Sequence, residues 1–451
     1  MTQSTNHPIN QQQPGLVREL RLPDVVAIVV GVVIGSGIFL VPSDIARSLA
    51  SPAHALLVWI VGGLLTLFGA LSLAELAAMA PGAGGFYTIL RAAYGDRAGF
   101  LYTWSFLLLI NTGSLATLAV AFGIYAAQLV PLSAVGQKVV AVAVLLLLTW
   151  VNCLGVRAGK WVQNIFTLAK LSGIAILCGI VFWHRAPFAA VAAADGFSLA
   201  SLWNIPWVAF GVALVAVMWA YEGWAWVSFS GAEMKNPTRD LPIGLFVGTL
   251  IVTTVYLTAS TAYYSVLTVG EIAGAARVAA ETIVRLVGPG AAAFISFLIL
   301  TSIFGSVNGT ILTGPRCYYA IAADGLFFRP FARIHPRYHT PVFAIVFQGF
   351  WAALLTILGT FQQLFTAVVF AAWISYAAVV AAVIVLRHKQ PDRPRPYRVP
   401  GYPWLPVLFI VASLAIVASA TRAEPLHVGV SIALILGGLP VFALLRRSSK
   451  A

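Results

Sequence analysis

Two ionisable side chains stand inside long apolar stretches of this sequence, where a formal charge is costly. Glu222 follows Trp219 and Tyr221 and precedes Gly223 near the middle of one stretch, and Lys170 lies about eleven residues into another. A charged side chain at the centre of a bilayer costs about 2.5–3.5 kcal/mol on insertion scales, so each needs a partner or a wet cavity. Either group can carry a proton, Glu222 can hold a cation, and Lys170 can replace one. A structural pairing with a neighbouring helix is the alternative for both.

A third unusual stretch is Gly31–Pro42, which reads G-V-V-I-G-S-G-I-F-L-V-P. It lies in an apolar run long enough to cross a bilayer as a helix, yet Gly35, Ser36 and Gly37 are poor helix formers. Unwound backbone is tolerated in lipid only where it faces a protein-lined cavity. A half-helix that starts after this break would point its free N–H groups, from about Gly37 and Ile38, at a carboxylate in that cavity. The alternative is a glycine seam for close helix packing.

The composition predicts a polytopic, all-α membrane protein. The chain has 451 residues, of which 60% are hydrophobic and only 9% are charged, and its mean hydropathy is +0.92. A soluble protein of this size carries about a quarter charged residues. The net charge of +13 does not indicate a nucleic-acid partner, because the basic residues lie in short loops and form no stripe interleaved with aromatic side chains.

Apolar runs predict twelve transmembrane helices, with a ten-helix core and two appended helices. The runs span residues 24–48, 54–79, 98–130, 138–156, 160–184, 205–230, 241–267, 287–319, 341–359, 361–386, 403–421 and 427–445. Residues 1–17 are predicted to be a disordered cytoplasmic tail, and no cleavable signal is expected before the first span. The core takes residues 18–386, a basic cytoplasmic loop takes 387–402, and the last two helices with a short cytoplasmic tail take 403–451.

The distribution of lysine and arginine predicts the orientation of the chain. With both termini placed in the cytoplasm, twenty of these residues fall on the cytoplasmic side and six on the outer side, and Lys170 is left inside the fifth span. Cytoplasmic loops of membrane proteins carry such an excess of positive charge. The predicted location is therefore the cell membrane, crossed many times, with both termini inside.

The two interrupted spans, at Ser36 and Glu222, are separated by about five spans. Interruptions in corresponding positions of two halves are typical of a transporter whose site is built from inverted repeats. A zwitterion that crosses a membrane must exchange its hydration for fixed dipoles at both charged ends. Opposed half-helix ends, with N–H groups from one and C=O groups from the other, supply those dipoles without burying formal charges.

Enzymatic chemistry is not expected within the spans, and neither is a metal or another cofactor. The three cysteines, Cys153, Cys178 and Cys317, match neither metal-ligand nor disulfide spacing, and the seven histidines form no cluster. No nucleophile–base pair or set of metal ligands is apparent in the spans, so an intramembrane enzyme is excluded. No catalytic residue is therefore assigned.

The sequence resembles the amino acid–polyamine–organocation superfamily. Within it, the chain is most similar to the L-type amino acid transporters, the light chains of heteromeric transporters and their bacterial relatives. The stretches that carry the resemblance are IVVGVVIGSGIFLVP, FGALSLAELAAMAPGAGGFY, VNCLGVRAGKWVQNIFTLAKL, WAYEGWAWVSFSGAEMKNPTRDLP and TSIFGSVNGTILTGPRCYYAIAADGLF. The fold implied is a core of five plus five inverted-repeat helices, broken at helices one and six, with two extra helices.

The resemblance also implies roles for particular residues. Backbone N–H groups at the first break would bind the substrate carboxylate, and carbonyls around Trp219 and Ala220 would receive its ammonium. Trp219 would close over the bound substrate from outside. Lys170 would stand near Gly31 and Ser306, where sodium-coupled relatives hold an ion, so sodium dependence is not expected. The substrate site predicted in this way comprises Ile34, Gly35, Ser36, Gly37, Ile38, Trp219, Ala220, Tyr221, Glu222 and Gly223.

Two departures from the family pattern affect the predicted partners. Residues 129–138 contain no cysteine, whereas the light chains carry one in this outer loop for a disulfide to a heavy chain. No covalently linked heavy chain is therefore expected, and the lipid bilayer and a small amino acid are the predicted partners. Glu222 stands where many members have glycine or another small residue, and it resembles the light chains that accept basic as well as neutral amino acids. A protonated Glu222 that serves gating is the alternative.

The predicted function is secondary transport of L-amino acids across the plasma membrane. Exchange of one amino acid for another is favoured by the resemblance, with neutral and possibly cationic substrates. Proton-coupled symport through Lys170 is one alternative, and a membrane amino-acid sensor that binds without transporting is another. The short tails offer no added signalling domain, which argues against the sensor.

Overall fold

The computed structural model describes residues 16–184, 199–275 and 277–448. In these residues the secondary structure is helical, apart from two isolated β-bridges. Residues 1–15 of the predicted tail lie outside the described residues, as does the last part of the predicted C-terminal tail, 449–451. The prediction of an all-α polytopic protein is confirmed.

Residues 16–184 form eight α-helices and a π-helical turn. The helices are α1 (Leu22–Val33), α2 (Gly37–Ser48), α3 (Pro52–Met79), α4 (Phe86–Tyr94), α5 (Asp96–Ser105), α6 (Asn111–Ala126), α7 (Ala134–Cys153) and α8 (Val156–Trp183). The π-helical turn η1 (Phe106–Ile110) joins α5 to α6. The local sequence determines where several of these helices begin. Pro52 occupies the first turn of α3, where its missing N–H costs nothing, and the Ser133 side chain accepts a hydrogen bond from the Gly136 N–H at the start of α7.

The described residues from 199 onward contain eleven further α-helices. They are α10 (Trp207–Ala220), α11 (Pro237–Tyr264), α12 (Val269–Gly274), α13 (Val278–Val287), α14 (Ala291–Thr313), α15 (Pro315–Ala323), α16 (Val342–Leu358), α17 (Phe361–Lys389), α18 (Trp404–Ala423), α19 (Pro425–Leu436) and α20 (Gly438–Ser448). Short 3₁₀ turns are η2 (Leu199–Trp203), η3 (Trp226–Phe229), η4 (Gly231–Glu233) and η5 (Arg329–Ala332).

Nine helical segments of the described chain are long and apolar enough to cross a membrane, and the bent pair α1–α2 makes ten. Two shorter apolar helices, α10 and α16, lie where the sequence predicts the sixth and ninth spans. A bilayer core of about 30 Å needs about 20 helical residues, and these two helices are shorter than that. The count of twelve spans therefore stays a prediction.

Some boundaries differ from those expected from apolar runs. The short helices α4, α12 and α13 lie in segments predicted as loops, because their apolar residues cover one helix face only and give no long apolar run. α17 continues to Lys389, so the first three residues of the segment predicted as a basic loop are helical.

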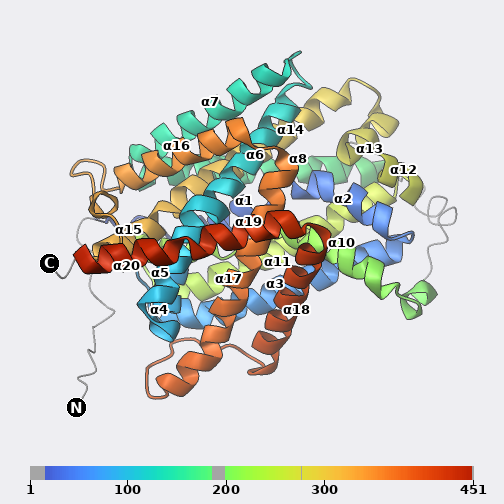
Figure 1. Ribbon diagram of the computed structural model, residues 1–451. Coiled ribbons are helices and arrows are strands. Elements are labelled where there is room, and N and C mark those ends of the chain that lie inside the picture. Colours follow the sequence, from blue (N-terminus) through green and yellow to red (C-terminus); the bar gives the residue numbers. More distant parts are fainter. Residues whose placement is uncertain (1–15, 185–198, 276, 449–451) are drawn as a thin grey trace.

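Helix α1 lies in the middle of the bundle and packs against α8, α11 and α14 (Figure 1). Its contacts with α8 are polar along the first two turns. Asp24 accepts hydrogen bonds from Lys160 at 3.3 Å and Asn164 at 2.7 Å, and Thr167 donates to the Ala27 carbonyl at 3.1 Å. Residues 160, 164 and 167 share one helix face, so α8 presents a row of donors to α1.

An ion pair between two buried side chains joins several segments at the end of the bundle where α1 begins. Arg316 donates two hydrogen bonds of 2.9 Å to Glu233, and both side chains are at most 1% exposed. The Glu233 carbonyl accepts from the N–H groups of Glu19 and Leu20, both at 2.9 Å. The segment before α1 is thereby fastened to η4 and, through Arg316, to α15.

A second buried carboxylate joins α3 to the loop that follows α17. Glu75 is fully buried and accepts hydrogen bonds from Arg387 at 2.9 and 2.6 Å and from the Val399 N–H at 2.8 Å. It also forms an ion pair with Arg395, whose nearest nitrogen lies 3.3 Å away. A buried carboxylate needs such compensation by charge and hydrogen bonds. Glu75 therefore has a structural role at the end of α3. Its contacts with Arg395 and Val399 also hold the basic loop against the bundle.

Candidate functional site

The first break separates α1 from α2 at residues 34–36, and the two helices meet at a bend of 44°. The N–H groups of Ser36, Gly37 and Ile38 donate to no carbonyl oxygen of the described residues. The first turn of any helix leaves such donors without intrahelical partners, and they carry the positive end of the helix dipole. The start of α2 is therefore chemically suited to a carboxylate.

Lys170 of α8 hydrogen-bonds to the residues at the break between α1 and α2. Its ammonium group donates to the carbonyl oxygens of Gly31 at 2.8 Å, Ile34 at 2.5 Å and Ser302 at 2.8 Å, and to the Ser306 hydroxyl at 3.2 Å. Ser306 and Ser302, one turn apart on α14, also donate to the Ile34 carbonyl. The lysine is fully buried. The Lys170 nitrogen thus lies at the C-terminal end of α1, where the negative end of the helix dipole favours a positive charge.

The second break follows α10, which ends at Ala220. From Tyr221 to Ala225 the chain turns, and only 3₁₀ turns follow as far as Glu233, so the second half of this predicted span is not α-helical. Gly223 has φ of +100°, which L side chains rarely adopt, and a Cβ there would lie 2.5 Å from Val32. Glycine at this position therefore allows both the turn and its close contact with α1.

The ends of the two broken spans touch each other. A Cβ built on Gly37 would lie 2.8 Å from both the Cα and the Cβ of Ala220. The hydroxyl of Tyr256, from α11, lies 3.0 Å from the Val33 carbonyl oxygen and 2.7 Å from that of Ala220. One tyrosine thereby links the C-terminal ends of α1 and α10, beside the N-terminal end of α2.

Within the part of the chain that the structure describes, one side chain hydrogen-bonds to the Glu222 carboxylate. Tyr376 of α17 donates to its Oε1 at 2.5 Å, and the Tyr376 ring stacks on Trp224 with centroids 5.3 Å apart. Tyr376 is 2% exposed, whereas Glu222 is partly exposed. Since one oxygen is bound by the tyrosine, the second carboxylate oxygen is the one available to a ligand.

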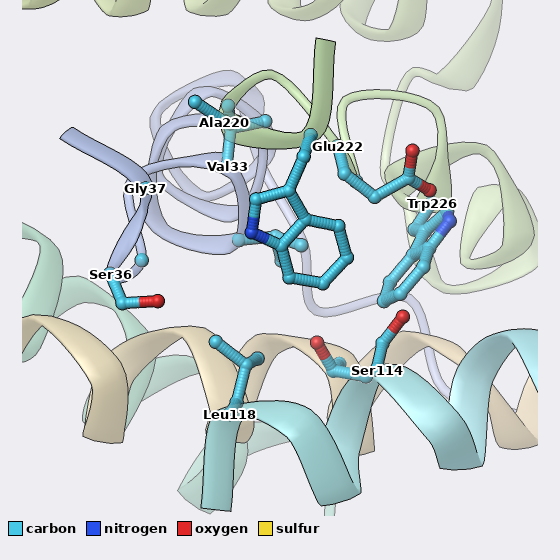
Figure 2. A pocket seen from close by; sticks show the side chains of 13 residues that line it. Val33, Ser36, Gly37, Ser114, Leu118, Ala220, Glu222 and Trp226 are labelled. Atoms are coloured by element: carbon cyan, nitrogen blue, oxygen red, sulfur yellow. The ribbon is translucent and has the colours of Figure 1, made fainter. Parts of the chain in front are cut away.

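These groups border one small cavity. Figure 2 shows Ser36 and Gly37 on one side, Glu222 and Trp226 on another, and Ser114 and Leu118 on α6 facing both. The lining is formed by Val32, Val33, Gly35, Ser36, Gly37, Ser114, Leu118, Trp219, Ala220, Glu222, Gly223, Trp226 and Thr310. The cavity is mostly apolar, with a few convergent polar groups, as is usual for small-molecule sites.

The structure brings most of the predicted site residues to this cavity, although not all of them line it. Tyr221 turns away, and its hydroxyl donates to the Trp59 carbonyl at 3.2 Å. Ile34 contributes its carbonyl to Lys170 instead, and Ile38 lies outside the lining. The carbonyls expected to receive an ammonium already accept hydrogen bonds, that of Trp219 from the Glu222 N–H at 2.9 Å and that of Ala220 from Tyr256.

Several site residues were missed from the sequence. Tyr256 and Tyr376 are two of fourteen tyrosines, and nothing in their local sequence separates them from the others. Ser302 was detectable, because it precedes Ser306 by four residues and must share its helix face. Ser114 reaches the cavity from α6, which is distant in sequence from both breaks, whereas Trp226 lies only four residues after Glu222.

Two interrupted helices around a central cavity define this chain as a secondary membrane transporter. A family model described as amino acid permease matches residues 20–440, and the chain belongs to this family. It is 32% identical to the serine/threonine exchanger SteT of Bacillus subtilis, over 96% of this chain and 98% of that protein. It is 33% identical to the mouse large neutral amino acids transporter small subunit 2 (97% and 85% covered), and 32% to the human b(0,+)-type amino acid transporter 1 (92% and 86%).

Family membership confirms three predictions made from the sequence. The protein is a multi-pass membrane protein, it is a transporter rather than an enzyme, and amino acids are the class of substrate that its family carries. The predicted resemblance to the L-type amino acid transporters is likewise confirmed.

Proposed function

We propose that this protein exchanges one amino acid for another across the cell membrane. The observation that carries the proposal is the meeting of two half-helix ends of opposite polarity, at Gly37 and Ala220, on one cavity. An α-amino acid has the matching pair of charges on adjacent atoms. The substrate carboxylate binds the free N–H groups at the start of α2, where the helix dipole is positive.

The substrate ammonium binds at the carbonyl ends of α1 and α10. The Ala220 oxygen has a second lone pair besides the one that faces Tyr256, so it can accept a further hydrogen bond. The Val33 oxygen already accepts from Tyr256 and from the Gly35 N–H at 2.8 Å, so it contributes to the negative end of the α1 dipole without a free lone pair. Trp219, which lines the cavity, covers the bound substrate from the outer side. The substrate side chain then extends along the cavity toward α6 and Glu222.

Exchange is favoured over symport by two considerations. The most similar curated relatives include a protein named as an exchanger, over nearly its whole length. In addition, Lys170 already places a positive charge at the C-terminal end of α1, which leaves no role there for a sodium ion. Transport should therefore depend on an amino acid on the opposite side and not on sodium.

Proteoliposomes test this proposal directly. Vesicles loaded with unlabelled amino acid should take up labelled amino acid, and empty vesicles should take up almost none, in sodium or in choline buffer. Uptake into empty vesicles driven by an inward proton gradient would contradict exchange and favour proton symport. Binding to the purified protein without uptake under any loading would instead indicate a sensor.

The position of Glu222 supports a substrate range that includes cationic amino acids. Its carboxylate lines the cavity, and Tyr376 fixes only one of its two oxygens. The other oxygen is placed to pair with a cationic side chain, which offsets part of the desolvation cost of both charges. We therefore propose that cationic L-amino acids are accepted alongside neutral ones.

The variant Glu222→Gln should lose arginine exchange selectively while retaining leucine exchange. The glutamine keeps the shape and the contact with Tyr376 but lacks the charge, and one charge-assisted hydrogen bond corresponds to about a tenfold to hundredfold effect. Labelled arginine and leucine uptake in one preparation measures the effect, and Glu281→Gln, at an exposed position of α13, is the matched control. Equal loss of both substrates, or no arginine exchange by the parent protein, would contradict the counter-ion role.

The protein is proposed to work without a covalently attached heavy chain and with both termini in the cytoplasm. Its three cysteines are free, and Cys178 and Cys317 are buried. The strong excess of positive charge on one side of the predicted spans supports the orientation. Unchanged migration of the membrane-extracted protein with and without reductant is the expected result for the first statement.

A further inference from the structure

Four exposed arginine side chains at one end of the bundle form no ion pair with the described residues. They are Arg157, at the start of α8, and Arg329, Arg333 and Arg337, between α15 and α16. The sequence contains no aspartate or glutamate in residues 97–184 or 325–391. Asp324, just before the second segment, is paired with Arg91 at 2.5 Å. The charges of the four arginines are therefore not offset by the chain around them.

The two segments that carry these arginines lie against each other. The Thr340 hydroxyl donates to the Cys153 carbonyl at 3.2 Å, and this bond joins the α15–α16 connection to the end of α7. α7 and α16 pack side by side (Figure 1). The Phe331 ring in η5 packs on Phe343 of α16, with centroids 5.0 Å apart. The four arginines therefore lie on neighbouring segments at one end of the bundle, and we term them the arginine patch.

Stripes of exposed apolar side chains lead away from the arginine patch along three helices. Residues three or four apart share one helix face, and Arg157 stands one turn before the first residue of the α8 stripe. α7 ends at residue 153, α8 begins at 156 and α16 begins at 342, so all three stripes start at the patch. In a membrane such faces meet lipid tails, and the charged end of each face lies at headgroup level. The stripes, with each side chain at least 44% exposed, are Trp161, Ile165 and Leu168 on α8, Phe343, Val346 and Phe350 on α16, and Leu146, Leu147 and Trp150 on α7.

The basic segment after α17 differs from the arginine patch. Arg387 and Arg395 pair with Glu75, and Arg393 donates to the Met79 carbonyl at 3.0 Å. These three cations are bound by groups of the protein itself. The guanidinium groups of the patch instead remain available to an anion from outside the chain.

We propose that the arginine patch binds the headgroup of an anionic phospholipid. Guanidinium groups bind phosphate oxygens through paired, charge-assisted hydrogen bonds. The acyl chains of the same lipid lie along the apolar stripes of α7, α8 and α16. A molecule with a charged head and hydrocarbon tails fits both features, whereas an acidic soluble protein would use only the charges. In the proposed orientation the patch faces the cytoplasmic leaflet, whose surface is negative.

Lipid binding by the purified full-length protein in detergent tests this inference. Native mass spectrometry measures the affinity for phosphatidylglycerol, with phosphatidylcholine as the zwitterionic reference. The variant Arg329→Gln/Arg333→Gln/Arg337→Gln should bind phosphatidylglycerol about a hundredfold more weakly, because each arginine near an anionic lipid contributes about fivefold. Its affinity for phosphatidylcholine and its thermal unfolding in detergent alone should match the parent.

A matched control removes the same charge elsewhere. The variant Arg18→Gln/Arg239→Gln/Arg398→Gln changes three exposed arginines outside the patch and should bind phosphatidylglycerol as the parent does. Equal weakening in both variants would reduce the effect to net charge and overturn the assignment, as would parental affinity in the patch variant. Displacement of phosphatidylglycerol by an equal concentration of free glycerol phosphate would indicate a small-anion site instead. Tighter binding of a polyglutamate peptide than of phosphatidylglycerol would indicate an acidic protein partner.

Discussion

Replacement of Gly37 by valine is expected to abolish substrate binding and exchange. A Cβ at this position would lie 2.8 Å from the backbone of Ala220, so a branched side chain must push the start of α2 away from the end of α10. The two half-helix ends would then no longer present donors and acceptors to the same small zwitterion. A displacement of about 1 Å in such a site costs about a hundredfold. Labelled leucine uptake and equilibrium binding measure the loss.

The matched control is Gly211→Val, in the broken sixth span. A Cβ at Gly211 has no atom of the described chain within 4 Å, so the same substitution meets open space. We expect Gly211→Val to fold and to exchange amino acids as the parent does. If Gly37→Val bound leucine with near-parental affinity, the first break would not form part of the binding site.

Replacement of Lys170 by methionine is expected to reduce exchange about a hundredfold. Methionine fills a similar volume, yet it removes the donor that joins the carbonyls of Gly31, Ile34 and Ser302. The unwound end of α1 then loses its fixed geometry and the positive charge at the negative end of the helix dipole. Exchange rates in proteoliposomes, in sodium and in choline buffer, are the measurement.

An exposed lysine provides the control for this variant. Lys235 lies at the surface just after η4, and Lys235→Met should exchange at the parental rate. If Lys170→Met also kept the parental rate in both buffers, Lys170 would be a structural residue only. If sodium stimulated the parent protein itself, the interpretation of Lys170 as a fixed substitute for an ion would be wrong.

The sequence predicted those features of the site that depend on the properties of individual residues in a bilayer. Gly35, Ser36 and Gly37 predict a break in any apolar span, and a lysine about 16 Å into a span needs buried acceptors. Glu222 was likewise recognisable by the cost of its charge. These features depend on local composition and on the bilayer, which are both visible without a fold.

Other parts of the site depend on which helices become neighbours. Tyr256 and Tyr376 reach the breaks from α11 and α17, and only tertiary packing assigns them partners. Ser114 requires knowledge of the π-helical turn before it, which apolar periodicity does not reveal. The shortness of α10 was also missed, because Trp224, Trp226 and Val227 continue the apolar run after the helix has ended.

A cryo-EM structure of the full chain in lipid nanodiscs with saturating leucine tests the central claim most directly. The account predicts density for one amino acid in the cavity, with its carboxylate at the N–H groups of Ser36, Gly37 and Ile38. Its ammonium should lie at the carbonyl ends of α1 and α10. An amino acid bound elsewhere, or bound here with its carboxylate pointing away from α2, would contradict the assignment of the site.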